Sequence, residues 1–243
     1  MNQALTAIEY SKVSPTRDYL QDIAKVMASF QQLFIEPDPN HWHTALELTD
    51  SGFKTQIKNL VFDINDGGVL SIDDEHWKLA DLTADSLIER LQTWLDQHAL
   101  GKKIKAPNLA NNLNHNQAAA ENIIEALTWS EHLFTKIKPM LSVGESSPIL
   151  LYPHHFDSSM TLFVQENLQY TLGFSIGDQT IAEPYFYTTA YPETEVFTNR
   201  KINSPAFWQK DGFSGVVLKY NDLINLDVPQ ALVIKYFQEA LGL

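Results

Sequence analysis

Cysteine is absent from the 243 residues of this chain. Its absence excludes disulfides, thiolate nucleophiles, iron–sulfur clusters and zinc–thiolate sites. Basic residues are also few, since 17 Lys and Arg stand against 30 Asp and Glu and the net charge is −13. Because an acidic surface repels phosphate groups, we expect neither nucleic acid nor an anionic membrane surface as a partner.

Long apolar runs are absent as well. No segment approaches the roughly 18 uninterrupted apolar residues of a membrane span. The first fifteen residues lack the basic start and apolar run of a signal peptide, so we expect a cytoplasmic protein. Hydrophobic residues make up 44% of the chain and aromatic residues 11%, which is enough for a packed core. Nothing in the sequence indicates a cofactor or an oligomeric state.

The spacing of apolar residues predicts four helices and two blocks of strands. A helix is expected over about 15–35, a second from Thr83 onward, a third across 123–137 and a last one capped by Asp227. Three or four short strands are expected within 42–74. More strands are expected within 148–192 and at 212–220, with a loop over 192–212 between them.

Strands grouped in blocks predict an α+β fold, with antiparallel or mixed sheet and flanking helices. Both parts of the chain run in the order helix, strands, helix. They could therefore be two similar halves, 14–98 and 116–243, joined by a polar linker at 99–115. Convergent strand–turn–strand patterning in an α+β fold is the favoured alternative. We predict that residues 1–243 form a single integrated domain.

Histidines occur in two tight groups, and one group stands next to an acid. On a strand, His41 and His43 would share a face, and His155 would share a face with Asp157. A metal site would be built from these four residues. No complete metal-binding motif is present, however, and such histidines more often hydrogen-bond without an ion.

Aromatic hydroxyls and an acid alternate along the segment that begins at Glu183. Tyr185 and Tyr187 fall on the same strand face as Glu183, while Pro184 and Phe186 fall on the other. Tyrosine hydroxyls beside a carboxylate can bind a polar ligand or act as acid and base. Tyrosines that pack at the rim of a core are the alternative. Phosphate-binding glycine loops and the GxSxG elbow of α/β-hydrolases are absent.

Several segments together resemble a bacterial family catalogued as domain of unknown function family 5996. They are NHWHTALELTDSGFKT at 40–55, FDIND at 62–66, AAENIIEALTWSEHLFTKI at 119–137, SPILLYPHHFDSSMTLF at 147–163 and EPYFYTTAYPE at 183–193. The resemblance extends over about 16–241 and implies one integrated unit, but it carries no activity. The family varies before its Phe-Asp pair, which makes His154 and His155 weaker candidates. The firmer candidates are His43, Phe156, Asp157, Tyr187, Tyr191 and Pro192.

Together these features predict a pocket rich in His, Asp and Tyr that binds a small molecule and could be catalytic. His43 and Asp157 would be the acid–base or orienting pair. The expected ligand-binding residues are Trp42, Glu183, Tyr185, Tyr187 and Tyr191. A non-catalytic protein-interaction module and a metal-dependent hydrolase are the two alternatives, so whether the protein is an enzyme stays open.

Overall fold

In the computed structural model, residues 5–110, 115–141 and 144–243 are described. The chain divides into two compact units, which are treated separately below. Unit 1 comprises Met1–Ser11, Trp129–Ile149 and Asp157–Leu243. Unit 2 comprises Lys12–Thr128 and Leu150–Phe156. A single integrated domain, the similarity of two halves and the boundaries of the linker stay predictions.

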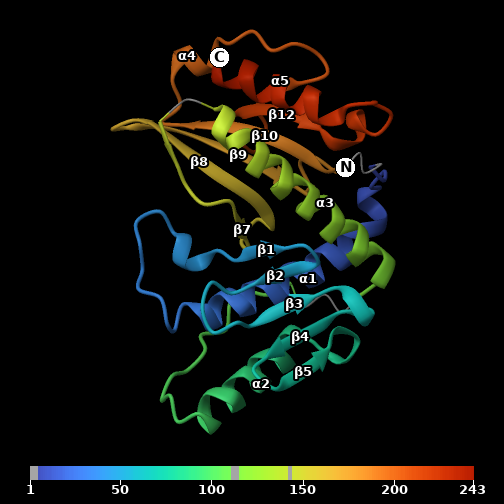
Figure 1. The fold of residues 1–243 in the computed structure, drawn as a ribbon, viewed down its shortest axis with the longest axis vertical. Helices are drawn as coiled ribbons and strands as arrows, with labels where there is room; N and C mark the ends of the chain where they lie inside the picture. The colour runs from blue at the N-terminus through green and yellow to red at the C-terminus, as the bar shows by residue number, and fades with distance from the viewer. Residues whose placement is uncertain (1–4, 111–114, 142–143) are drawn as a thin grey trace. The chain divides into compact units, whose positions relative to one another are not determined.

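Unit 2 contains a five-stranded antiparallel sheet in which neighbours in sequence are neighbours in space (Figure 1). Its strands are β1 (Glu47–Thr49), β2 (Gly52–Lys54), β3 (Val61–Asp63), β4 (Val69–Ile72) and β5 (Glu75–Lys78). Gly52 is required at its position, because a Cβ there would come within 2.0 Å of the Phe62 carbonyl oxygen. Strand β7 (Leu150–Tyr152) joins this unit through Leu151, which exchanges two backbone hydrogen bonds with Leu46.

Helices α1 (Tyr10–Gln31) and α2 (Ala84–Gln97) supply apolar side chains to the core of unit 2. Thr83 caps α2 as predicted, and its hydroxyl accepts from the Ser86 backbone N–H while the Ser86 hydroxyl accepts from Thr83. Helix α1 ends four residues earlier than expected. The Gln31 side chain donates to the carbonyls of His43 and Ala45, so the returning chain takes the place of another helical turn.

Unit 1 contains an antiparallel sheet whose strands follow the order β11-β12-β10-β9-β8-β6. These strands are β6 (Glu145–Ser146), β8 (Asp157–Gln165), β9 (Leu168–Ser175), β10 (Tyr185–Tyr191), β11 (Phe207–Gln209) and β12 (Gly215–Lys219). Unit 1 also contains residues Trp129–Ile137 of α3 (Gln117–Ile137) and the whole of α5 (Pro229–Leu241), and Figure 1 shows α5 beside these strands. The predicted α+β class with antiparallel sheet is therefore confirmed.

The two faces of this sheet differ in what covers them. On one face, the Phe186 ring lies 4.8 Å from Phe174 on β9, 6.1 Å from Phe134 on α3 and 6.0 Å from Phe237 on α5. Phe186, Phe174, Phe134 and Phe237 are all fully buried. Because strand residues alternate in direction, the neighbours of Phe186 on β10 point to the opposite face. That face carries the tyrosines and is discussed below.

Four local expectations were wrong. Residues 42–44 form a single 3-10 turn and not a strand, and residues 153–156 form a turn before β8. The expected loop at 192–212 contains α4 (Glu195–Thr198) and the short edge strand β11. Val228, rather than Asp227, occupies the N-cap of α5, with Pro229 in its first turn. No helix within the described ranges is long and apolar enough to cross a membrane.

Candidate functional site

His41 and His43 belong to the 3-10 turn of unit 2 rather than to one strand face. His41 has a left-handed backbone with φ 60°, and its ring centroid lies 6.0 Å from that of His43. The His43 Nδ1 is 3.2 Å from the Asp38 carboxylate, which also accepts the His43 backbone N–H at 3.0 Å. The Asp38 backbone N–H also lies 3.2 Å from the same Nδ1, so Asp38 orients the His43 imidazole within unit 2.

His154 and His155 lie on a turn of unit 2 whose backbone carbonyls accept hydrogen bonds from two side chains of α1. Gln21 donates to the carbonyls of Pro153 and His154, at 3.1 and 2.7 Å, and Arg17 donates to the His155 carbonyl at 2.6 Å. The side chains of His154 and His155 are exposed, with ring centroids 4.8 Å apart. The expectation that His155 lies on a strand and shares a face with Asp157 was wrong, because long-range side-chain hydrogen bonds shape this turn.

Phe156 follows the two histidines and is fully buried, with a left-handed backbone at φ 56°. Its ring contacts Phe53 edge-on at 6.3 Å, and the Arg17 guanidinium lies 5.8 Å from the ring centre. A bulky residue with positive φ is strained unless its surroundings fix it. Phe156 thus anchors the turn to the core of unit 2.

The histidines and acids do not supply a recognisable metal site. Within residues 5–110, 115–141 and 144–243, no group of three or more His, Asp or Glu side chains is arranged to hold a metal ion. The set His41, His43, His155 and Asp157 therefore gains no geometric support from this part of the chain. The metal-dependent hydrolase stays a prediction.

Asp157 and Tyr187 meet on the face of the unit 1 sheet opposite to Phe186. The Tyr187 hydroxyl donates to the Asp157 carboxylate across the intervening strand β9. Gly173 stands between them, and a Cβ there would lie 2.2 Å from the Tyr187 ring and 2.4 Å from its hydroxyl. Burial, together with the negative charge of Asp157, raises the pKa of Tyr187 well above its usual value. Tyr187 is therefore a neutral donor to a carboxylate.

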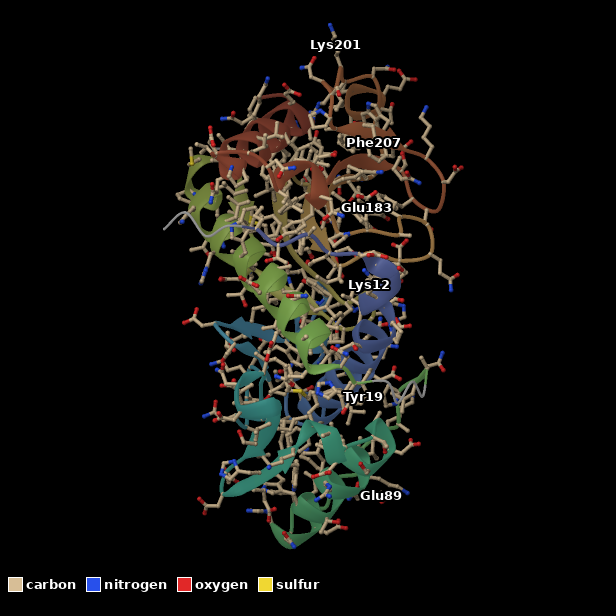
Figure 2. The ribbon with its side chains drawn as sticks, turned by 90° about the vertical axis from the view of Figure 1, so that its right-hand side faces the viewer. Lys12, Tyr19, Glu89, Glu183, Lys201 and Phe207 are labelled. Carbon is tan, nitrogen blue, oxygen red and sulfur yellow. The ribbon has the colours of Figure 1, made fainter. Side chains whose placement is uncertain are left out.

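Tyr185 and Glu183 each have a partner within unit 1. The Tyr185 hydroxyl donates to Asp178 at 2.8 Å, and burial followed by the charge of Asp178 raises the pKa of Tyr185. The Glu183 carboxylate pairs with Lys219 at 2.6 Å. The Lys219 ammonium also lies 5.9 Å from the centre of the Phe207 ring. Glu183 and Phe207 are both labelled in Figure 2. These side chains are half-buried or buried. The end of the face that begins at Tyr185 is therefore its buried end.

The same face becomes polar and then open toward the other end of β10. Its next row consists of Thr161, Thr171 and Thr189, which are aligned across β8, β9 and β10. The last row consists of Phe163, Gln169 and Tyr191, aligned across the same strands. We call this last row and the hollow beside it the Tyr191 hollow.

The Tyr191 hollow has a volume of about 310 Å³. It is lined by Phe163, Gln169, Tyr191, Pro192 and the residues of the β8–β9 turn. Tyr191 is 73% exposed, whereas Tyr185 on the same face is 4% exposed. The register between β8 and β9 shifts between Phe163 and Gln165, beside the hollow. Such irregularities re-aim side chains at the ends of sheets.

The structure therefore unites some of the predicted residues and separates others. Asp157 and Tyr187 form one pair, and Tyr191 with Pro192 lines a hollow further along the same face. His43 and Trp42 belong to unit 2, so the pairing of His43 with Asp157 stays a prediction.

Three residues of this face were missed by the sequence analysis: Phe163, Gln169 and Gly173. Alternation along each strand carries a signal for the first two, and a glycine inside a strand is a signal for the third.

Residues 165–242 match the model of DUF5996, a family of unknown function. Strands β9 to β12 and helix α5 fall within this range, as do Tyr187, Tyr191 and Pro192. The resemblance inferred from the sequence is thereby confirmed for this region, and for residues 16–164 it stays a prediction. No curated protein and no solved structure matches the chain.

Proposed function

We propose that the DUF5996 region of this chain binds a small, polar, uncharged molecule in the Tyr191 hollow. One observation carries the proposal: a hollow of about 310 Å³ lies at the end of the polar sheet face and is lined by an aromatic ring that the fold leaves 73% exposed. This volume is near the lower end of the range of small-molecule sites, roughly 300–1,000 Å³.

The lining of the hollow supports a polar occupant. Gln165, Asn167 and Gln169 contribute amide groups, and Phe163 and Tyr191 contribute rings. Few polar groups beside apolar surface are typical of sites that orient a small ligand. Glu166 is the only charged side chain among the lining residues, so the site offers little attraction to an anion.

The buried end of the face supports the hollow mechanically. Tyr187 crosses Gly173 and hydrogen-bonds Asp157, which links β8, β9 and β10 two rows away from the open end. A site built on paired strands holds its side chains more accurately than one on a free loop. In this proposal, Asp157 and Tyr187 position the strands that carry the ligand-binding residues.

Saturation-transfer NMR with a panel of D-glucose, uridine, nicotinamide and acetamide, which are all uncharged, tests the proposal. We expect at least one probe to bind the wild-type protein and to lose its signal in Tyr191→Ala. Val196→Ala is the matched control, because Val196 is 74% exposed nearby but does not line the hollow. Absence of binding by all four probes, or binding unaffected by Tyr191→Ala, would overturn the proposal.

A further inference from the structure

Three side-chain amides line the Tyr191 hollow, those of Gln165 and Asn167 exposed and that of Gln169 half-buried. Gln165, Asn167 and Gln169 each carry a side-chain amide with two N–H donors and one carbonyl acceptor. None of the three amides is hydrogen-bonded to another described residue. An occupant that both donates and accepts at several positions would satisfy these groups best.

The aromatic rings of the hollow favour an occupant that also has an apolar face. Tyr191 exposes most of its ring at the end of β10, and Phe163 lies in the same row of the sheet. The face of an aromatic ring is electron-rich and attracts weakly positive C–H groups. A ligand matched to both features has one apolar C–H face and a rim of hydroxyls.

We infer that the ligand of the Tyr191 hollow is a saccharide. A pyranose ring presents axial C–H groups that can lie on Tyr191 and equatorial hydroxyls that the amides of Gln165, Asn167 and Gln169 can bind. Each hydroxyl donates once and accepts twice, which matches the mixed capacity of an amide. The inference rests on the proposed function, since it names the ligand class of the same site.

A planar heterocycle fits the hollow less well. It would stack on Tyr191, but its few polar atoms would leave most of the three amides without partners. A cation would be attracted by Glu166 and by the ring faces, yet it would leave the amide N–H groups unused. The number of free amides in the lining therefore distinguishes a saccharide from other ligands that stack on an aromatic ring.

The test compares methyl β-D-glucopyranoside and maltose with uracil and nicotinamide, which carry no sugar, by saturation-transfer NMR on the full chain. We expect the two saccharides to bind more tightly than the two heterocycles. Saturation should be strongest at the axial protons of the sugar, because these would lie on the Tyr191 ring. Tyr191→Trp should retain the affinity, and Tyr191→Ala should reduce it about fivefold or more.

Gln169→Ala separates stacking from hydrogen bonding. It should weaken the binding of both saccharides while changing uracil binding less, because the heterocycle depends mainly on the ring. Val196→Ala again serves as control, and far-UV circular dichroism checks that each variant is folded. If uracil or nicotinamide binds through Tyr191 and no saccharide does, the saccharide inference fails while the proposed function stands. If no probe binds, both fail.

Discussion

Replacing Gly173 by alanine should destabilise unit 1 because of one neighbour, the Tyr187 ring. The glycine has no left-handed backbone, so alanine can adopt its conformation without strain. The added Cβ would instead lie 2.2 to 2.4 Å from three atoms of Tyr187. The ring must move, and it cannot do so without weakening the hydrogen bond from its hydroxyl to Asp157.

The size of the effect follows from two contributions. Inserting a methyl group into a packed site costs about 1–3 kcal/mol. A hydrogen bond to a charged group contributes about 1.5–3 kcal/mol, and Asp157 is only 5% exposed, so its loss is poorly compensated by water. We expect Gly173→Ala to lower the free energy of unfolding by about 2–5 kcal/mol, with both contributions arising from Tyr187.

A double-mutant cycle with Tyr187→Ala measures this dependence. Without the ring, alanine should be better than glycine within a strand by about 0.5–1 kcal/mol, because it restricts the unfolded chain. The sign of the Gly173→Ala effect should therefore reverse in the Tyr187→Ala background. Urea unfolding followed by circular dichroism gives the four stabilities, with a constant m-value as the check on comparable transitions.

Tyr191→Ala provides the matched control for the cycle. Tyr191 lies on the same face of β10 but pairs with Gln169 rather than with Gly173, two rows away from Tyr187. Its coupling to Gly173→Ala should stay within about 0.5 kcal/mol. If Gly173→Ala costs the same whether or not the Tyr187 ring is present, the steric explanation is wrong.

Two further predictions concern a helix cap and a buried hydroxyl. Thr83→Ala should lower the free energy of unfolding by about 1 kcal/mol, because the Ser86 N–H loses its acceptor; faster hydrogen exchange at Ser86 would show it. Tyr187→Phe should make the loss of stability at alkaline pH shallower. Above about pH 10 the unfolded chain ionises this tyrosine while the folded chain retains its proton, so stability falls as pH rises. An identical slope in urea unfolding of wild type and Tyr187→Phe would contradict the assignment.

The elements that could be predicted from the sequence are those specified by nearby residues. The start of α2 depends on Thr83 and Ser86, three positions apart, and the block order of strands sufficed for the α+β class. The turns at 42–44 and 153–156 were mistaken for strands because residues far away in sequence shape them. Gln21 reaches the carbonyls of Pro153 and His154 across more than 130 positions, and no local pattern encodes such a bond.

The candidate site shows the same division between local pattern and long-range pairing. Alternation correctly placed Tyr185 and Tyr187 on one face, but the partner of each hydroxyl depends on the register of β8, β9 and β10. That register brings the Tyr187 hydroxyl within hydrogen-bond distance of Asp157 and places Gly173 against the Tyr187 ring. Whether Asp157 has a catalytic role stays a prediction, while its part in linking three strands follows from the hydrogen bond.

The three tyrosines of β10 differ in how much their side chains contribute to the fold. The Tyr185 hydroxyl is held by Asp178 and the Tyr187 hydroxyl by Asp157, and both side chains stabilise the sheet. Tyr191 is 73% exposed, although exposing an aromatic ring forgoes the stability that burial would give. A ring that contributes little to folding and borders a hollow is better explained by an external ligand. The density of aromatic hydroxyls drew attention to β10, and the exposed fraction of each side chain is the reason why the proposed function assigns the ligand to Tyr191 rather than to Tyr185 or Tyr187.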